Sequence, residues 1–293
     1  GSNGKGSTAA MTAALLQQGL NAVGLFTSPH LLDLNERFRI DNEDIADDEL
    51  DHHWRDVATA IEAEGLSTKI GGFEFLFLIA ADYFAARKCV HTVWEGGIGG
   101  RLDPVRLINA RRLALTSLDL EHTELLGATL EAIARDKVEA AARRAHLYAP
   151  DAIAVRDAIA AHCAERGVEL TLVAPHENAP LPGAHQRANA ALAIKLARAM
   201  IERSHGPPAP RRHTSTLAGE GAGGPYLALD AAVIANGLSN TRWPGRLEII
   251  QEEPLIVIDV GHTPAAIRAA LQGFNTMRGE QKGLLVCGAS ADK

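Results

Sequence analysis

The first eight residues, GSNGKGST, form a glycine-rich segment that leads directly into an alanine-rich one. In residues 9–19 alanine and leucine recur at helical spacing up to Gly19, which predicts a helix that follows a glycine-rich turn. The backbone N–H groups of such a turn bind phosphate, and the ammonium group of Lys5 adds positive charge. Ser7 or Thr8 would then supply a hydroxyl oxygen to a magnesium ion.

The same eight residues also allow a simpler interpretation. In the strict P-loop pattern, G-x-x-x-x-G-K-[ST], lysine directly precedes serine or threonine, whereas here Gly6 separates Lys5 from Ser7. A leading Gly-Ser is also a common remnant of cloning. On these residues alone, a phosphate-binding turn and a flexible leader fit the sequence equally well.

Strands and helices alternate through the first half of the chain. Apolar periodicity predicts such elements at 21–28, 73–86, 89–97, 113–118 and about 129–144. Thr129 is a suitable N-cap for the last of these, a helix. The alternation predicts an α/β domain with a mainly parallel sheet. Ligands bind at the carboxyl ends of strands in such sheets, which is where Ser28, Glu95 and His122 fall.

The second half of the chain contains a long loop and the start of another domain. Residues 204–225 are rich in proline, glycine and serine and predict a surface loop or insertion. An apolar strand in PLIVIDVGHTP, a helix from about Pro264 and a strand in GLLVCGAS predict the opening of a second βαβ unit. We therefore expect one domain at 1–253 and a second, cut short, at 254–293. We also expect the strand that would precede Gly1 to be missing.

Composition excludes several classes of protein. A net charge of -7 and a pI near 5.9 argue against a nucleic-acid-binding surface. No apolar run approaches the ~18 to 20 residues that a membrane span needs. The three cysteines lack CxxC spacing, so neither a disulfide framework nor a structural zinc site is indicated. We expect a monomeric, cytoplasmic protein without nucleic-acid or membrane partners.

Further along the chain, four short segments carry candidate ligands. They are TSPHL with Ser28, WEGGIGGRLD with Glu95, SLDLEHTELLG with His122, and IARDK with Lys137. Glycines let a ligand approach the backbone, and a carboxylate at a strand end can hold magnesium. Each segment also has an ordinary explanation: a Ser-Pro turn, a solvated glutamate, a hydrogen-bonded histidine and a solvated lysine.

Together with GSNGKGST, HQRANAALAI, WPGRLEII and DVGHTP, these segments resemble, in order, the motifs of one enzyme family. It is the folylpolyglutamate synthase and dihydrofolate synthase branch of the Mur ligase superfamily, and the resemblance covers the chain except 204–225. The resemblance implies a P-loop domain with a mainly parallel sheet, followed by a truncated Rossmann-like C-terminal domain. It also implies an ATP-dependent ligase, in which a carboxylate becomes an acyl phosphate that an amino group, typically of glutamate, attacks.

The resemblance also assigns roles to individual residues. The turn that would hold the ATP phosphates comprises Gly4, Lys5, Gly6, Ser7 and Thr8. The magnesium ligands would be Ser28, Glu95 and His122, and the residues that act in catalysis Lys5, Lys137 and His122. Lys137 matches a lysine that the family carries as a carbamate. The remaining nucleotide contacts would be Asn189 near the adenine, Arg246 near the phosphates and Asp259 from the second domain.

Three segments depart from the family pattern. Where the family usually has GGRLDATN, this chain has Asp103 followed by Pro104, Val105 and Arg106. The usual AHNP is replaced by Gly261-His262-Thr263-Pro264, and the usual TYFE by Gly71-Gly72-Phe73-Glu74. The departures lie on the substrate side, so folate or dihydropteroate plus L-glutamate is the leading hypothesis for the substrates. A ligase for another carboxylate, such as a poly-γ-glutamate or peptidoglycan-type precursor, and a non-catalytic nucleotide-binding protein are the alternatives.

Overall fold

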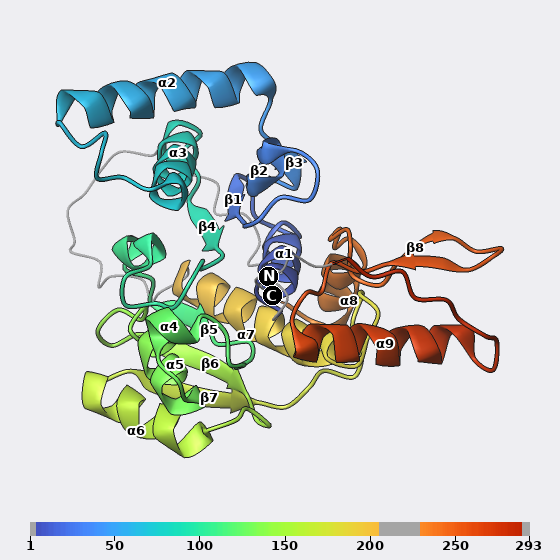
Figure 1. Ribbon diagram of the computed structural model, residues 1–293. Helices are drawn as coiled ribbons and strands as arrows, with labels where there is room; N and C mark the ends of the chain where they lie inside the picture. The colour runs from blue at the N-terminus through green and yellow to red at the C-terminus, as the bar shows by residue number, and fades with distance from the viewer. Residues whose placement is uncertain (1–3, 205–228, 289–293) are drawn as a thin grey trace, which may run out of the picture.

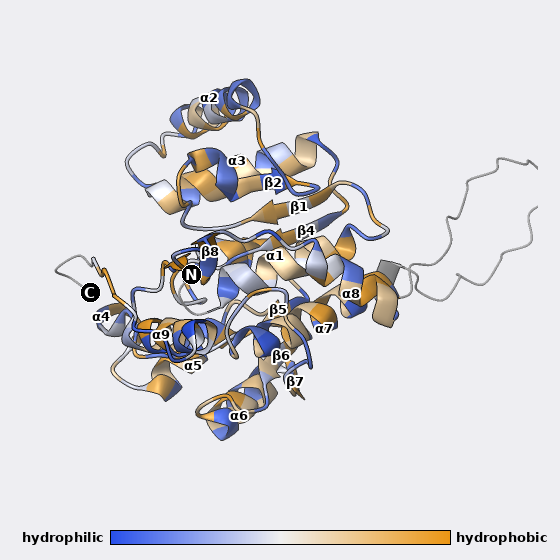
Figure 2. Cartoon of the chain, turned by 90° about the vertical axis from the view of Figure 1, so that its right-hand side faces the viewer, coloured by the Kyte–Doolittle hydropathy of each residue, from blue (hydrophilic) through white to orange (hydrophobic). Residues whose placement is uncertain are grey.

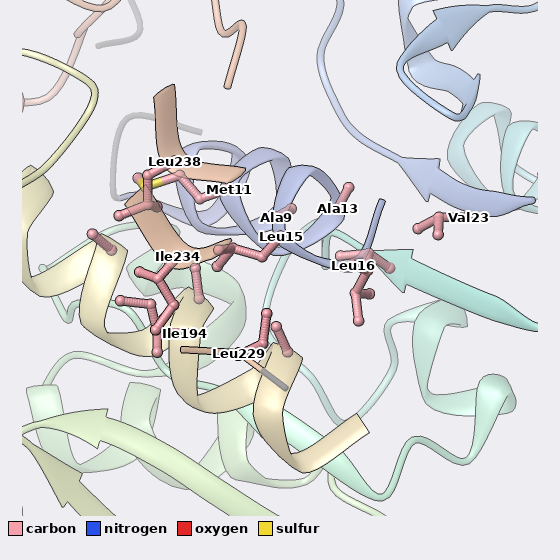
Figure 3. Packing of buried hydrophobic residues seen from close by; sticks show 14 of the residues in the cluster. Ala9, Met11, Ala13, Leu15, Leu16, Val23, Ile194, Leu229, Ile234 and Leu238 are labelled. Carbon is pink, nitrogen blue, oxygen red and sulfur yellow. The ribbon is translucent and has the colours of Figure 1, made fainter. Parts of the chain in front are cut away.

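Helix α1 (Lys5–Leu16) lies at the centre of the computed structural model, which describes residues 4–204 and 229–288 (Figure 1). Every residue of α1 from Gly6 to Leu16 is buried. Its apolar side chains pack against α7 (Gln186–Ser204) and α8 (Ala231–Ser239), as Figure 3 shows for Leu15, Ile194 and Ile234. The alanines of α1 have no long side chains, so the helices approach closely.

A four-stranded sheet lies on one side of α1. Its order is β3 (Glu43–Asp44), β2 (Phe38–Ile40), β1 (Val23–Phe26) and β4 (His91–Trp94). The β1–β4 pairing is parallel, whereas β1–β2 and β2–β3 are antiparallel. Figure 2 shows β1 and β4 between α1 on one face and α3 on the other. The helices of that outer layer are α2 (Asp47–Ala63) and α3 (Gly72–Ala86).

A second sheet is entirely parallel, with the order β5 (Arg112–Ala114), β6 (His146–Pro150) and β7 (Glu169–Val173). Side chains of β6 alternate between its faces, as expected for a strand. Leu147 packs with α5 (Leu130–Val138) and α6 (Arg156–Arg166), and Tyr148 packs with α7. This sheet is therefore covered on both faces, as parallel sheets usually are.

A cavity of about 570 Å³ separates the two sheets. Residues 90–96, which include β4, form one wall, and residues 110–117, which include β5, form the other. In the described part of the chain β4 and β5 belong to different sheets and are not paired with each other. Helices α1 and α7 contribute Ala9, Thr12 and Leu196 to the lining and thus bridge the two sheets.

The last described elements are a hairpin and a helix. Strands β8 (Glu248–Gln251) and β9 (Ile256–Ile258) pair antiparallel, and α9 (Pro264–Arg278) follows them. Thr263 caps α9, because its Oγ1 accepts a hydrogen bond from Ala266 N at 3.2 Å. The expected domain boundary after residue 253 falls between β8 and β9 and stays a prediction.

The structure confirms most of the predicted elements and the parallel α/β class. The helix predicted to reach Arg144 ends instead at Val138, because Ala140 N and Ala141 N donate to the oxygens three residues back, on Lys137 and Val138, and the α-helical hydrogen-bond pattern stops there. The strand predicted in GLLVCGAS is not formed over the described residues 283–288. The antiparallel strands β2 and β3 had no counterpart in the prediction. The predicted loop at 204–225 lies, beyond Ser204, outside the described residues.

Three short elements complete the described chain: 3₁₀ helices at Leu34–Arg37 and Pro104–Ile108, and helix α4 (Thr123–Leu126). The predicted N-cap Thr129 accepts a hydrogen bond from Ala132 N at 3.2 Å at the start of α5. Among the helices of residues 4–204 and 229–288, none is both long and apolar enough to cross a membrane.

Truncation of Leu15 tests the importance of the α1 contacts. Leu15 has no exposed surface, so Leu15→Ala should lower the free energy of unfolding by about 3 kcal/mol in urea titrations. Leu32→Ala is the control, since Leu32 is 81% exposed and its truncation should change the free energy of unfolding by less than about 0.5 kcal/mol. Equal effects of the two substitutions would contradict this account of the core.

Candidate functional site

The first turn of α1, together with Gly4 before it, is shaped to receive an anion. Gly4 has φ 82°, and no side chain caps the helix there. A Cβ atom on Gly4 would lie 2.5 Å from Oδ1 of Asn189, so both the backbone angle and the space require glycine. The first N–H groups of a helix have no acceptor within the helix, and the first turn of α1 has no acidic residue. The turn therefore presents partial positive charge, to which Lys5 adds a full one.

Polar side chains of α7 support the turn from behind. Gln186 Oε1 accepts from Asn189 Nδ2 at 2.9 Å, and Gln186 Nε2 lies 3.4 Å from Ser7 Oγ. Thr8 is 3% exposed, and its Oγ1 has no hydrogen-bond partner among residues 4–204 and 229–288. An unpartnered buried hydroxyl is unfavourable unless a ligand or an ion satisfies it. Asn189 thus lies against the turn, and its contact with adenine stays a prediction.

The parallel pairing of β1 with β4 brings Ser28 and Glu95 together. Phe26 is opposite Trp94 in this register, so the residues that follow both strands emerge side by side. Ser28 N donates to Glu95 Oε2 at 3.0 Å, and Glu95 N donates to Phe26 O at 2.9 Å. Glu95 is 2% exposed, so its carboxylate is held in a fixed, desolvated position.

Two arginines lie within electrostatic reach of Glu95. Burial lowers the pKa of Arg37, and the negative charge of Glu95 opposes this change. Burial also lowers the pKa of Arg246, which both Asp259 and Glu95 oppose. The predicted site residues Arg246 and Glu95 are therefore close to each other although they are far apart in the sequence.

Lys5 and Lys137 approach each other from α1 and α5. Burial lowers the pKa of Lys137, and the positive charge of Lys5 lowers it further, against the opposing effects of Glu121, Asp136 and Asp103. Burial raises the pKa of Asp103, whereas hydrogen bonds from Val105 N and Gly97 N and the charges of both lysines oppose the rise. Two half-buried lysines and a buried carboxylate therefore share one site.

Asp136 ties the glycine loop to α5. Its Oδ1 accepts from Gly100 N at 2.9 Å and from Arg101 N at 3.3 Å. A Cβ atom on Gly100 would lie 2.5 Å from the backbone oxygen of Lys137. At this position the loop thus needs glycine for its packing against α5, which places Lys137 beside the loop that follows Glu95.

Four of the predicted residues line one cavity. Lys5, Thr8, Glu95 and Lys137 are all among the residues that line the cavity between the sheets. Residues Ser28 and His122 are not part of its lining. His122 is exposed, has φ 49°, and accepts hydrogen bonds through its backbone oxygen from Leu125 N and Leu126 N. Its role as a metal ligand stays a prediction.

Within the part of the chain that the structure describes, no three His, Cys, Asp or Glu side chains converge in a metal-binding arrangement. This is compatible with magnesium, which commonly uses one or two protein oxygens together with phosphate oxygens and water. The predicted set of Ser28, Glu95 and His122 contains only two residues of those four types.

Asp259 holds two segments of the C-terminal region together. Its Oδ2 accepts from Leu247 N at 3.0 Å and its Oδ1 from Gly261 N at 2.7 Å. Its charge also acts on Arg246, which is half-buried, and on His185. The structure therefore places Asp259 beside a predicted phosphate-side residue, and its own contact with a nucleotide stays a prediction.

Some residues of the site were not predicted from the sequence. Gln186 and Trp243 both lie against the turn, and both occur inside segments already singled out, HQRANAALAI and WPGRLEII. Asp103 was noted only as the start of a departure from the family pattern. These three residues could have been predicted only from their positions inside or beside segments that resemble the family motifs.

The chain is similar to known proteins over most of its length. A model of the Mur ligase glutamate ligase domain matches residues 245–293. The chain is 32% identical over 300 residues to a probable bifunctional folylpolyglutamate synthase/dihydropteroate synthase of Haloferax volcanii, covering 91% of this chain and 32% of that protein. It is 31% identical over 302 residues to folylpolyglutamate synthase of Saccharomyces cerevisiae, covering 94% and 53%. The chain thus spans about a third to about half of the length of these relatives.

Solved structures share the fold. A folylpolyglutamate synthase complex with AMPPCP is 30% identical, with a TM-score of 0.79 over 94% of this chain and 70% of that one. A complex with AMPPCP and folate is 29% identical, with a TM-score of 0.81 over 95% and 70%. A bifunctional folylpolyglutamate synthase/dihydrofolate synthase with Mn, AMPPNP and L-glutamate is 29% identical, with a TM-score of 0.73 over 94% and 64%.

Replacement of Glu95 by glutamine tests the site's affinity for cations. Glutamine retains an oxygen that can accept from Ser28 N but has no negative charge. Glu95→Gln should weaken Mn²⁺ binding at least about tenfold, as measured by titration calorimetry with AMPPCP present. Glu62→Gln, on the exposed side of α2, is the matched control and should bind Mn²⁺ as the parent does. Unchanged affinity in Glu95→Gln would remove Glu95 from the metal site.

Proposed function

Because the chain belongs to the folylpolyglutamate synthase and dihydrofolate synthase family of the Mur ligase superfamily, we propose that it is an ATP-dependent carboxylate–amine ligase. It joins L-glutamate to a folate or a dihydropteroate through an amide bond. The observation that carries the proposal is the convergence of Lys5, Thr8, Glu95 and Lys137 on one cavity at the N-terminus of α1. Relatives solved with folate and with L-glutamate support the choice of substrates.

The reaction has two steps. The γ-phosphoryl group of ATP is transferred to a carboxylate oxygen of the substrate, which gives ADP and an acyl phosphate. The amino nitrogen of glutamate then attacks the acyl carbon, the bond from that carbon to the phosphate oxygen breaks, and the nitrogen loses a proton. The products are an amide, ADP and inorganic phosphate.

The residues of the turn stabilise the transferring phosphoryl group. The first N–H groups of α1 and the ammonium group of Lys5 are fixed before the reaction begins, so no reorganisation is needed as charge redistributes. Arg246 approaches the same region from the loop before β8, where Asp259 and Glu95 surround it with negative charge. In this arrangement Arg246 binds phosphate oxygens while the carboxylates limit the excess of positive charge.

The donors of the site fit a magnesium ion. Glu95 provides a buried carboxylate, Ser28 lies beside it, and the unpartnered Thr8 Oγ1 lies on the turn. Oxygen donors of this kind are those that magnesium prefers, and His122 would complete the predicted set. When bound, magnesium neutralises phosphate charge and brings phosphate and carboxylate oxygens together. Relatives solved with AMPPCP and with Mn and AMPPNP support ATP and a divalent cation as cofactors.

Lys137 carries a carbamate in this proposal. Its neutral amine adds carbon dioxide and releases a proton, which converts a cation into an anion. The lowered pKa that burial and Lys5 cause makes the neutral amine available at a lower pH than in an ordinary lysine. The resulting anion attracts the ammonium group of Lys5 and adds a negative charge with which the site can bind a cation.

The cysteines bear on the compartment in which the protein works. All three cysteines are free, and Cys163 is buried, which supports a reducing compartment such as the cytoplasm. A monomeric state and the lack of nucleic-acid partners remain predictions from composition.

An assay of phosphate release tests the activity. Protein with ATP, Mg²⁺, L-glutamate and either dihydropteroate or tetrahydrofolate should release phosphate, and Lys5→Ala should lower the rate by about 10² to 10³. Lys195→Ala is the control, because Lys195 is exposed on α7. Background rates with both pterins and a rise with another acid would overturn the folate assignment. Nucleotide binding without turnover for any acid would favour the non-catalytic alternative.

The carbamate can be observed directly. In ¹³CO₂-labelled buffer, the protein should show a carbamate carbon signal by NMR that grows as the pH is raised, because the neutral amine becomes more abundant, and the lowered pKa of Lys137 should let the signal appear at a lower pH than for an ordinary lysine. Lys137→Arg should lack this signal, and Lys195→Ala should keep it. A signal that persists in Lys137→Arg would mean that another amine carries the carbamate.

A further inference from the structure

Two polar groups beside the phosphate turn are buried without a partner. In the ranges that the structure describes, Thr8 Oγ1 and Trp243 Nε1 have no hydrogen-bond partner. Thr8 belongs to the turn itself, whereas Trp243 lies on the loop between α8 and β8. A buried polar group without a hydrogen-bond partner is unfavourable. One such hydroxyl group and one such N–H group beside the same turn therefore indicate a ligand that satisfies them.

The indole of Trp243 covers Gly6. A Cβ atom on Gly6 would collide with Cζ2 of Trp243 and would lie 3.0 Å from Cε2 and 3.2 Å from Nε1. The edge of the ring that carries Nε1 therefore faces the turn. The guanidinium of Arg39 lies 5.8 Å from the centre of the ring, and Asp44 in turn holds Arg39. These contacts fix the plane of the indole.

We propose that the indole N–H of Trp243 donates a hydrogen bond to a phosphate oxygen of the nucleotide bound at the turn of residues 4–8. This inference rests on the proposed function and adds a nucleotide-binding residue to it. An indole N–H is a donor only and carries no charge, so it directs a phosphate oxygen without adding to the positive charge of Lys5 and Arg246. The ring also excludes water from the turn, which strengthens the other interactions with phosphate.

The same contact explains why Gly6 stands between Lys5 and Ser7. Any side chain at position 6 meets the rigid indole rather than solvent. Gly6, which the strict P-loop pattern lacks at this point, thus provides the space that the indole of Trp243 occupies. The turn and the loop before β8 have to be considered as one binding surface, although one is at the start of the chain and the other near residue 243.

The test separates a phosphate contact from a packing role. Trp243→Phe keeps an aromatic ring and removes the N–H. It should weaken binding of AMPPCP and of ADP about tenfold, and leave binding of adenosine, measured by competition, unchanged. The matched control is Trp54→Phe, since Trp54 lies on α2 against Phe75 and away from the turn. Thermal unfolding of each variant establishes that it is folded.

Each outcome decides the matter. Equal losses for adenosine, ADP and AMPPCP would show a packing role, and unchanged binding of all three would show no role; either overturns this inference and leaves the proposed function standing. A parent protein that binds neither AMPPCP nor ADP overturns the proposed function and this inference with it.

A second pair of variants tests the contact with Gly6. Gly6→Ala should weaken AMPPCP binding at least as much as Trp243→Phe does, because the new methyl group collides with the indole and disturbs both the ring and the turn. The double variant Gly6→Ala/Trp243→Ala should bind AMPPCP more tightly than Gly6→Ala alone, since the collision is removed. If the double variant binds no better, the indole is not what restricts position 6.

Discussion

The close contacts on both sides of the first turn of α1 are the constraint on which the site depends. Asn189 lies against Gly4, and Trp243 lies against Gly6, so neither position has room for a side chain. Between them the N-terminus of a buried helix stays uncapped and open to an anion. The remaining groups are positioned relative to this turn: Glu95 by the register of β1 with β4, and Lys137 by the bonds of Asp136 to the glycine loop.

The sequence predicted those helices and strands that depend on the spacing of neighbouring residues. The spacing of alanine and leucine predicted α1. Ser28 and Glu95 were expected to lie near each other because each follows a strand of a parallel sheet, and the carboxyl ends of such strands meet at one edge. The strand predicted in residues 283–290 is absent from its described part, where Leu284 and Val286 are exposed. A strand needs neighbours to pair with, and sequence alone does not supply them. The contact of Trp243 with Gly6 was likewise beyond prediction, because it joins distant segments and has no periodicity.

The departures from the family pattern have local structural roles. Thr263, in place of the usual asparagine, caps α9 through its hydroxyl. Gly261, in place of alanine, lies so close to Asp259 that a Cβ would be 2.8 Å from its Oδ1. Pro104, where the departure from GGRLDATN begins, starts the 3₁₀ helix, and Val105 N donates to the side chain of Asp103, which fits the family pattern. These substitutions are compatible with the backbone around them, so they do not by themselves argue for a degenerate site.

The cavity between the two sheets has a consequence for how the protein holds together. Glu95 follows a strand of one sheet, whereas Lys137 belongs to a helix that covers the other, and β4 and β5 are not paired across the gap. A nucleotide and its cation that contact both walls replace part of the cohesion that strand pairing would provide in an undivided sheet. Occupancy of the site and the mechanical coupling of the two halves are then linked, so that each stabilises the other.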